Sequence, residues 1–307
     1  MPKPMQNRAA NRPGDGATGP DGYSGDSSGD FHTAFSDDSP GGTPGGSAHG
    51  PPLRLPSWLR RPLPTGRGFV ETRSLIGDLG LSTVCQGAKC PNIHECFSCG
   101  TATFLILGSV CTRNCAFCNI DPGSPPLPEP DEPRRVAEAA RRLGLQHVVV
   151  TSVTRDDLED GGAAHFAATI RAVREVLPQS SVEVLIPDFK GSRSALETVM
   201  REKPEVINHN VETHRSLYDR IRPQADYGQS LELLRRASEQ SITAKSGFMV
   251  GLGETDDDVR EVLSDLHAVG CAIVTIGQYQ RPSLRHPAVQ RYVWPLYTSD
   301  AAADLTR

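Results

Sequence analysis

The sequence predicts an α/β fold, in which a parallel sheet curls into an open barrel that carries an N-terminal extension. Along residues 101–294, short apolar segments rich in strand formers alternate with amphipathic segments of helical length. Six such β–α units in a row imply a parallel sheet. At 33.1 kDa and 37% hydrophobic residues, the chain is long enough for one large α/β domain plus an extension.

The predicted strands are short apolar runs. They cover residues 103–108, 147–152, 182–186, 205–209, 243–249 and 272–277. In barrel enzymes, the chemistry gathers where the C-terminal ends of the strands meet their loops, so residues that follow these segments are candidates for a site.

Three of the predicted helices carry clear start or stop signals. They lie within residues 133–144, 164–178 and 255–270. Pro133 occupies a first-turn position and Gly144 ends the first helix, whereas the second has one apolar stripe and ends at Pro178. Thr255 precedes three aspartates, whose charge favours the N-terminal end of the third helix.

The N-terminal part of the chain divides in two. Residues 1–56 contain 11 glycines and 9 prolines, so they cannot bury enough apolar surface to offset the entropy of ordering, and they are predicted to be a disordered, dispensable tail. This tail has six Asp against four Lys or Arg, unlike an Arg-rich transit peptide. Residues 57–100 are predicted to form the extension, with a short helix over 68–80.

Charge and hydropathy exclude two classes of function. The net charge is -5 and the pI is near 6.0, so no strongly basic face for nucleic acid is expected. No apolar run is long enough to span a bilayer. Because no signal peptide is recognised either, a cytoplasmic protein is expected.

Seven of the eight cysteines fall within residues 85–118, in two groups of three plus Cys99. Their spacings are C-x4-C-x5-C and C-x3-C-x2-C, on either side of the apolar segment 103–108; the members are Cys85, Cys90 and Cys96, then Cys111, Cys115 and Cys118. Soft thiolate ligands select zinc, copper(I) or iron–sulfur clusters. Three cysteines leave one iron of a cubane cluster open to a ligand from outside the protein.

Three other interpretations of these cysteines are open. An even number of cysteines can form a disulfide framework, although structural disulfides are unusual in the cytosol. The pairs Cys96-x2-Cys99 and Cys115-x2-Cys118 lie fifteen residues apart, which fits a zinc ribbon but leaves the other three cysteines unexplained. Single cysteines are often inert core residues, and this is the interpretation for Cys271 and Cys99.

The cysteine segments resemble a known family. C-x3-C-x2-C on a loop after a strand resembles the radical S-adenosylmethionine (SAM) superfamily. The segments STVCQGAKCPNIHECF (82–97), GTATFLILG (100–108) and CTRNCAFC (111–118) are similar to the lipoyl synthase family. The resemblance covers residues 58–294 and implies a partial (β/α)6 TIM-type barrel of the radical SAM type over 101–294, with residues 57–100 carrying an auxiliary cluster.

The same resemblance implies two [4Fe-4S] clusters and S-adenosyl-L-methionine as cofactors. The cluster on Cys111, Cys115 and Cys118 binds SAM and reduces it to methionine and a 5′-deoxyadenosyl radical. The cluster on Cys85, Cys90 and Cys96 supplies sulfur for carbons 6 and 8 of a protein-bound octanoyl chain. Implied partners are octanoylated carrier domains of 2-oxoacid dehydrogenase E2 subunits and of the glycine cleavage H protein, and a ferredoxin or flavodoxin as electron donor.

Four further residues are expected to bind the cofactor. Phe117 lies between the last two cysteines and, by resemblance, packs near the adenine of SAM. Thr151, Asn210 and Glu212 lie at predicted strand ends and are expected to line the cavity for SAM and substrate, although Asn210 or Glu212 could instead cap the next helix. No catalytic side chain is expected beyond the cluster ligands.

Two alternative functions and one departure from the family pattern complete the sequence-based expectations. The alternatives are another radical SAM enzyme whose second cluster relays electrons, and a zinc-binding interaction module on residues 85–118. Lipoyl synthases continue to an Arg-Ser-Ser-Tyr segment whose serine ligates the auxiliary cluster, and Ser299 is not identified with that ligand. Residues 295–307 are therefore interpreted as a non-native tail, from an adaptor or a misassembled gene end.

Overall fold

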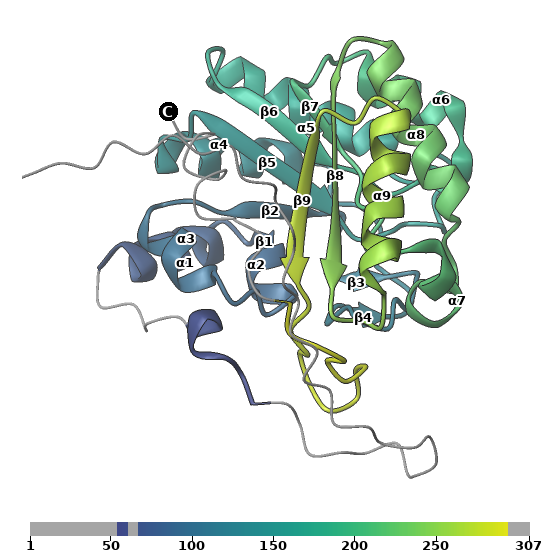
Figure 1. Cartoon of the computed structure of the whole chain (residues 1–307). Coiled ribbons are helices and arrows are strands. Elements are labelled where there is room, and N and C mark those ends of the chain that lie inside the picture. The colour runs from purple at the N-terminus through teal and green to yellow at the C-terminus, as the bar shows by residue number, and fades with distance from the viewer. Residues whose placement is uncertain (1–53, 61–66, 294–307) are drawn as a thin grey trace, which may run out of the picture. The chain divides into compact units, whose positions relative to one another are not determined.

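The computed structural model describes residues 54–60 and 67–293, all within the unit that runs from His49 to Arg307 (Figure 1). Two predictions fall outside the described residues. These are the tail at 295–307 and nearly all of the disordered segment predicted at 1–56. The six predicted strands and the three predicted helices with clear end signals lie inside them.

The core is one seven-stranded sheet with the strand order β1-β2-β5-β6-β7-β8-β9. The strands are β1 (Ser82–Thr83), β2 (Thr103–Ile106), β5 (His147–Ser152), β6 (Ser181–Leu185), β7 (Val206–Asn208), β8 (Thr243–Val250) and β9 (Ile273–Gln278). Strands β2 to β9 pair in parallel, as the sequence predicts, and only β1 pairs antiparallel. The two edges, β1 and β9, leave the barrel open.

All six predicted strands are confirmed, with shifts of no more than two residues at their ends. The largest shift is in β2, which ends at Ile106, whereas the prediction extended it to Gly108. Leu107 and Gly108 have positive φ angles of 67° and 93°, which a strand does not accommodate. The chain therefore turns sharply before the second group of cysteines.

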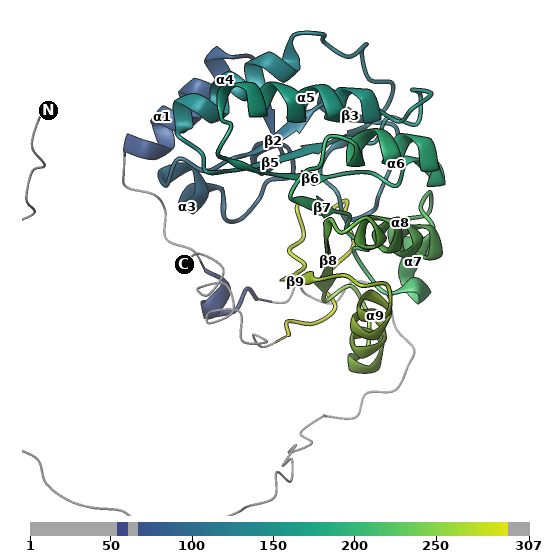
Figure 2. The ribbon, with the colours of Figure 1, turned by 90° about the horizontal axis from the view of Figure 1, so that it is seen from above.

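Helices cover the outer side of the arc of strands (Figure 2). They are α4 (Glu132–Leu143), α5 (Ala163–Val176), α6 (Arg193–Met200), α7 (Tyr218–Ile221), α8 (Tyr227–Glu239) and α9 (Asp256–Ala268). Strand residues that face these helices are completely buried, among them Val150, Val184 and Ile207. Burial of such aliphatic side chains stabilises the sheet by about 1.5–3 kcal/mol each.

The predicted end signals act as expected. Pro133 lies in the first turn of α4, and Gly144 ends that helix in the left-handed conformation, with φ of 65°. At the start of α9, the Thr255 side chain accepts a hydrogen bond from the Asp258 N–H, and the Asp258 carboxylate accepts one from the Thr255 N–H. This reciprocal pair is a capping box.

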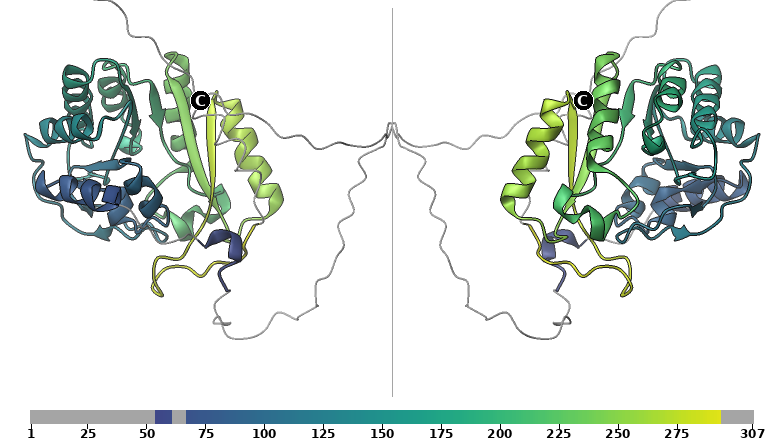
Figure 3. Two further views of the ribbon diagram at one scale, coloured as in Figure 1. Left: turned by 90° about the vertical axis from the view of Figure 1, so that its left-hand side faces the viewer. Right: turned by 90° about the vertical axis from the view of Figure 1, so that its right-hand side faces the viewer.

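The N-terminal extension folds onto the β2 edge of the sheet. It contains α1 (Arg67–Asp78), α2 (Val84–Gly87) and α3 (Ile93–Ser98), in addition to the 3-10 turn Ser57–Leu59 and strand β1. Thr72 on α1 donates a hydrogen bond of 2.8 Å to the carbonyl oxygen of Phe97, whose ring is completely buried. The predicted helix at 68–80 is confirmed. Figure 3 shows these blue N-terminal helices and the yellow-green α9 on opposite sides of the arc.

Polar residues occupy the inner side of the sheet. Glu183 on β6 accepts hydrogen bonds from Lys245 on β8, at 2.9 Å and 3.1 Å, and from Asn208 on β7, at 2.9 Å. Burial works against ionisation of Glu183, but hydrogen bonds from His147, Lys245 and Asn208 lower its pKa to about 2. The inner side of the sheet thus holds ionised groups that are paired by hydrogen bonds, whereas the side that faces the helices is apolar.

Candidate cofactor and catalytic site

The second group of cysteines lies on a closed loop at the C-terminal end of strand β2. Short strands β3 (Val110–Cys111) and β4 (Asp121–Pro122) pair with one another and tie the two ends of the loop together. We call residues 111–122 the cysteine loop. The Gly123 N–H also donates to the Cys111 carbonyl oxygen at 2.8 Å. The loop therefore holds its shape by its own backbone bonds.

The turn into this loop is strained and is held by buried charged groups. Leu107 has the left-handed φ of 67°, an arrangement that costs a residue with a side chain about 1–3 kcal/mol. Its N–H donates to Glu132 at 2.9 Å, and its carbonyl oxygen accepts from Arg155 at 3.1 Å. His165 contacts the same Glu132 oxygen at 2.7 Å. Glu132 and Arg155 thus hold the backbone of Leu107, and His165 holds Glu132 in turn.

Arg113, between the first two cysteines of the loop, links it to two neighbouring strand ends. Its guanidinium donates to Asp156 at 2.7 Å and 3.0 Å and to Asp188 at 2.8 Å and 2.7 Å. Arg113 is only 6% exposed, so these four charge-assisted bonds are largely shielded from water. Although burial opposes ionisation, Arg113 lowers the pKa of Asp188 to about 2.

The sequence analysis did not single out any of these three residues. It marked the segments after strands β5 and β6 only as regions that could line a cavity. An arginine between two cysteines, with aspartates directly after two strands, was the available signal. It could not indicate that the three side chains would pair, because that depends on how the strand ends are placed beside one another.

Hydrogen bonds to two segments, residues 154–156 and 221–224, hold the rest of the loop. Thr112 exchanges hydrogen bonds with the backbone of Thr154 and Asp156, at 2.9–3.1 Å. The Asn114 N–H donates to the Gln224 side chain at 2.7 Å, and the Ala116 N–H donates to the Ile221 carbonyl oxygen at 2.9 Å. These contacts preorganise the loop before any cofactor is bound.

The three thiols of the cysteine loop lie close enough to affect one another. Burial, together with the neighbouring Cys115 and Cys111 thiols, raises the pKa of Cys118 to about 11. Burial also raises the pKa of Cys115, whereas the guanidinium of Arg222 lowers it. A metal cation stabilises the thiolate forms of cysteines such as Cys115 and Cys118, and three soft sulfur donors gathered on one loop fit an iron–sulfur cluster.

The first group of cysteines forms a second, similar set. Cys85 lies on α2, Cys96 on α3, and Cys90 on the turn between them, where its N–H donates to the Cys85 carbonyl oxygen at 3.0 Å. Burial raises the pKa values of Cys85 and Cys96. The neighbouring thiols raise them further: Cys90 that of Cys85, and both Cys85 and Cys90 that of Cys96. This set also fits a cluster held by three thiolates.

These groupings bear on the other interpretations of the cysteines. All eight cysteines lie in the described part of the chain and are free thiols, so the structure contains no disulfide framework there. The pKa of Cys96 is raised by the thiols of Cys85, Cys90 and Cys99, and the pKa of Cys118 by those of Cys115 and Cys111. Each group of cysteines is therefore close within itself. Cys99 is exposed at the C-terminal end of α3, and Cys271 is partly buried against the core.

The chain segments that carry the two cysteine sets contact one another through Asn119 and Gly87. The Asn119 side chain, directly after Cys118, donates a hydrogen bond of 2.9 Å to the Gly87 carbonyl oxygen, two residues after Cys85. A Cβ atom on Gly87 would lie 2.7 Å from the Ile120 side chain. The two segments therefore approach as closely as a glycine permits.

Three of the four other predicted site residues lie at or beside the cysteine loop. Phe117 packs against the buried side chains of Ile221, Leu252 and Tyr279. Asn210 hydrogen-bonds to Glu212, which has a positive φ of 66°, and burial raises the pKa of Glu212. The charge of Glu212 in turn raises the pKa values of Cys115 and Cys118, which places it beside the loop.

Thr151 has a different environment. It lies within β5, is 5% exposed, and its hydroxyl donates to the Leu185 carbonyl oxygen on β6 at 3.0 Å. In this structure the hydroxyl joins two strands. Neither Asn210 nor Glu212 provides a side-chain cap for a helix among the described residues.

Arg222 is a further site residue that the sequence analysis did not identify. It is 8% exposed and donates to the carbonyl oxygens of Asn210 and Val211, at 3.0 Å and 3.3 Å, and to the Tyr218 hydroxyl at 3.1 Å. Its buried Nε atom has no partner among the described residues. A buried guanidinium with a spare donor, close enough to lower the pKa of Cys115, suits an anionic ligand group.

The segment after β9 also contacts the cysteine loop, at Cys118. The ring of His286, 7% exposed, contacts the Cys118 carbonyl oxygen at 3.0 Å through Nε2 and the Ser283 hydroxyl at 2.9 Å through Nδ1. The Tyr279 hydroxyl donates to the Pro287 carbonyl oxygen at 3.0 Å. We call residues 279–293 the C-terminal strap. Sequence reasoning did not link it to the cysteines.

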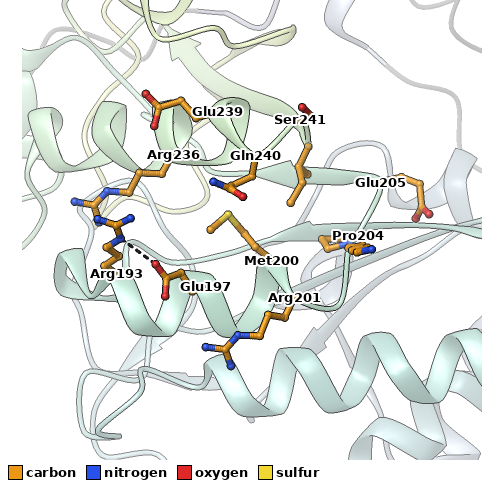
Figure 4. Close-up of a pocket in the computed structure, with 12 residues that line it drawn as sticks. Arg193, Glu197, Met200, Arg201, Pro204, Glu205, Arg236, Glu239, Gln240 and Ser241 are labelled. Atoms are coloured by element: carbon orange, nitrogen blue, oxygen red, sulfur yellow. Dashed lines mark hydrogen bonds and ion pairs between the residues drawn. The ribbon is translucent and has the colours of Figure 1, made fainter.

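A cavity in the described residues lies elsewhere, between α6 and α8 (Figure 4). Its volume is about 610 Å³. Its lining includes residues just before β7 and β8, at the N-terminal ends of those strands and so at the opposite end of the sheet from the cysteines. The lining mixes both signs of charge, including the ion pair between Arg193 and Glu197 at 2.9 Å. It contains none of the predicted site residues.

One group of side chains away from the cysteines has metal-ligand chemistry. The ring nitrogens of His214 lie 3.2 Å from Asp258 and 3.0 Å from Glu261, and Arg215 also pairs with Glu261. Both nitrogens and both carboxylates already have partners within the protein. The group is therefore an ion-pair network between the start of α9 and the turn before α7.

Sequence comparison shows which known proteins this chain is similar to. Residues 105–266 match the model of the radical SAM superfamily. The chain is 66% identical over 253 residues to a protein of Oleidesulfovibrio alaskensis named lipoyl synthase, covering 82% of this chain and 87% of that protein. It is 67% identical over 245 residues to a lipoyl synthase of Nitratidesulfovibrio vulgaris, covering 80% of this chain and 82% of that protein. A Chlorobaculum parvum lipoyl synthase is 52% identical, covering 80% and 84% respectively.

Solved structures share the fold at low sequence identity. HydG, a maturase of the [FeFe]-hydrogenase, superposes with a TM-score of 0.51 at 16% identity, covering 72% of this chain and 56% of that chain. Streptococcus suis SuiB, solved with S-adenosylmethionine bound, superposes with a TM-score of 0.51 at 12% identity, covering 61% and 43%. In both cases the matched part is less than two thirds of the larger solved chain. No helix among the described residues is long and apolar enough to cross a membrane.

Proposed function

The chain belongs to the lipoyl synthase family of the radical SAM superfamily, and we propose from this that it inserts sulfur at carbons 6 and 8 of a protein-bound octanoyl group to form a lipoyl group. The observation that carries the proposal is the pair of three-thiol sets, which are joined where Asn119 meets Gly87. Sulfur insertion by a radical needs the radical source and the sulfur source to face one substrate.

Each cysteine set has a separate role in this proposal. Cys111, Cys115 and Cys118 hold the cluster that binds SAM, as membership of the superfamily implies. We propose that Cys85, Cys90 and Cys96 hold a second cluster that supplies the sulfur. When bound, the cofactors supply electron transfer to SAM, a radical able to abstract hydrogen from an unactivated carbon, and the sulfur atoms.

The remaining side chains of the site position and shield the reacting groups. Arg113, with Asp156 and Asp188, keeps the cysteine loop fixed against two strand ends. We propose that Arg222, Asn210 and Glu212 bind the polar parts of SAM and that Phe117 packs on its adenine. This assignment is supported by the unpaired Arg222 donor and by the nearness of Glu212 and Arg222 to the loop thiols. Thr151 is proposed to shape the cavity wall from within β5.

The chemistry of the reaction implies the partners. The substrate is an octanoylated lipoyl carrier domain; we propose the E2 subunits of 2-oxoacid dehydrogenases and the glycine cleavage H protein, with a ferredoxin or flavodoxin as the electron donor. We also propose a cytoplasmic location, where thiols and clusters stay reduced.

The test uses the full chain, reconstituted anaerobically with iron and sulfide, and an octanoylated peptide as substrate. The two products to be measured are 5′-deoxyadenosine and the thiolated peptide. Cys115→Ala should abolish 5′-deoxyadenosine, because the SAM-binding set loses a ligand. Cys90→Ala should still form 5′-deoxyadenosine but no thiolated peptide.

Each alternative function has its own outcome in this test. An enzyme whose second cluster only relays electrons would form 5′-deoxyadenosine but no thiolated peptide in the unmodified chain. A zinc-binding module would purify colourless, with zinc and without acid-labile sulfide. Equal effects of the two substitutions would contradict separate roles for the two cysteine sets.

A further inference from the structure

The last cysteine of the cysteine loop and the two residues after it contact both the N-terminal extension and the C-terminal strap. We call residues 118–120 the bridging tripeptide. Its Asn119 side chain bonds to Gly87 on the side of the extension, at 2.9 Å, and its Cys118 carbonyl oxygen is contacted by His286 of the strap, at 3.0 Å. Residues 32 and 168 positions away in sequence thus contact this tripeptide.

On the side of the extension, the contact is direct and tight. Gly87 is the last residue of α2, the helix that carries Cys85. A side chain on Gly87 would collide with Ile120, since its Cβ atom would lie 2.7 Å from the Ile120 Cδ1 atom. The Asn119 Nδ2 atom makes the bond to the Gly87 carbonyl oxygen, and the amide oxygen Oδ1 is buried and has no partner among the described residues. The bond to Gly87 is therefore the one side-chain bond that Asn119 makes there.

On the side of the strap, the contact is rigid. His286 is buried, and the Ser283 hydroxyl orients its ring from the opposite nitrogen, at 2.9 Å. Arg281 donates to the His286 carbonyl oxygen at 2.7 Å, which fixes the backbone of the same turn. The strap thus holds the bridging tripeptide at Cys118, while the Asn119 side chain binds the last residue of α2.

We propose that Asn119 is a positioning residue that sets the distance between the two cysteine sets. The inference rests on the proposed function, in which a radical formed at one set must meet sulfur held at the other. Rates of such reactions are sensitive to placement, and a misplacement of about 1 Å costs on the order of 10²-fold. Asn119 touches neither substrate nor the reacting atoms in this proposal. It acts through the position of α2.

The test compares Asn119→Ala with Asn114→Ala in the reconstituted full chain. Asn114 is a matched control, because it is the same residue type in the same loop, its side chain is exposed, and only its backbone N–H is bonded. In Asn119→Ala, the dipolar coupling between the two reduced clusters, measured by pulsed electron paramagnetic resonance, should weaken or broaden. The ratio of thiolated peptide to 5′-deoxyadenosine should fall about 10- to 100-fold. Asn114→Ala should match the unmodified chain in both measurements.

A second measurement covers a variant that does not load iron. Hydrogen exchange of the metal-free full chain should show faster exchange at residues 84–90 in Asn119→Ala than in Asn114→Ala, because only the first loses the bond to α2. Equal exchange in the two variants would overturn the proposal, as would an unchanged dipolar coupling with an unchanged product ratio. If the unmodified chain forms no thiolated peptide, the proposed function fails, whereas the coupling and exchange measurements still decide the role of Asn119.

Discussion

At the scale of single residues, the site depends on charged side chains that are paired out of contact with water. Arg113 and Asp188 are the clearest case, with side chains 5% and 0% exposed and two hydrogen bonds between them. A buried pair of this kind adds little net stability compared with an apolar pair, but loss of one partner leaves the other charge uncompensated. Such pairs therefore fix geometry more than they add to stability.

Arg113→Ala should lower the free energy of unfolding by about 3–5 kcal/mol, because Asp188 would remain buried without a partner. Arg113→Lys should have a smaller effect, because the ammonium group keeps a positive charge beside Asp188. Some stability should still be lost, since an ammonium group cannot form both two-point pairs. Urea unfolding of the full chain measures this. Arg193→Ala is the control, because the Arg193–Glu197 pair is exposed and should contribute less than about 1 kcal/mol. An Arg113→Ala effect as small as the control's would contradict the role assigned to Arg113.

Glu183 predicts a pH dependence of stability. Its pKa is about 2 in the folded chain, below the ordinary value of 4.5, so the folded state favours the ionised form. The contribution of Glu183 is present above pH 4.5 and is lost as the pH falls towards 2. Glu183→Gln should therefore destabilise the chain by about 1–3 kcal/mol at pH 7, and the difference from the unmodified chain should narrow between pH 4.5 and pH 3. A difference that stays constant over this range would show that Glu183 is not ionised in the barrel.

At the scale of helices and strands, tight turns decide where the site begins. The start of α5 packs on the strained turn after β2: a Cβ atom on Gly162, which has φ of 91°, would lie 2.4 Å from the Leu107 side chain. Gly162 therefore serves both as a left-handed N-cap residue and as a point of close approach. The helix and the turn into the cysteine loop depend on the same glycine.

Gly162→Ala should destabilise the chain by about 2–4 kcal/mol, because it adds both a backbone strain and a collision. Gly77→Ala in α1 is the matched control, since a Cβ atom there would meet nothing within 4 Å. That substitution should stabilise the chain by about 0.5–1 kcal/mol, since alanine favours the helix. Thermal or urea unfolding measures both. Similar effects of the two substitutions would contradict the packing described for α5.

At the scale of the whole described unit, the barrel and the cysteine segments differ in how they are held. Strands β5 to β8 are held by parallel hydrogen bonds and a completely buried aliphatic layer. The cysteine loop and the extension are held by their own backbone bonds and by hydrogen bonds to neighbouring segments, and both contain thiols whose pKa values are raised. Cofactor binding should therefore stabilise these segments in particular.

Removal of iron and sulfide should leave the barrel folded. Hydrogen exchange should remain slow in β5 to β8, whereas exchange should become faster at residues 84–96 and 111–122, because their thiols lose the cluster that holds them together. The helical circular dichroism signal should change little. A cooperative loss of structure throughout the chain on iron removal would show that the clusters also hold the barrel.

The order of the strands and helices was predictable from the sequence because it depends on local patterns. The strand at 147–152 was placed without error, and the ends of α4 and α9 follow from Pro133, Gly144 and Thr255. Strand β1 was missed, because two residues are too few for a hydrophobic period. The sequence does not delimit helices α6 to α8, although it predicts the strands β6, β7 and β8 that lie before, among and after them.

The site was only partly predictable, for a related reason. The six cysteines and their division into two triplets follow from spacing along the chain. The partners of the cysteine loop do not, since Asp188, Arg222 and His286 are 75 to 168 residues away in sequence from Arg113, Cys115 and Cys118, on which they act, and nothing local marks them.

The sequence by itself determined the α/β class, the strand order along the chain, the two thiol sets and the family to which they point, because periodicity and ligand spacing are local properties. Only the tertiary structure decided which charges pair, that Asn119 reaches Gly87, and that the C-terminal strap contacts Cys118. These contacts arise where the ends of parallel strands converge, and the distances between such ends are set by packing of the whole sheet against its helices and not by any neighbouring residues in the chain.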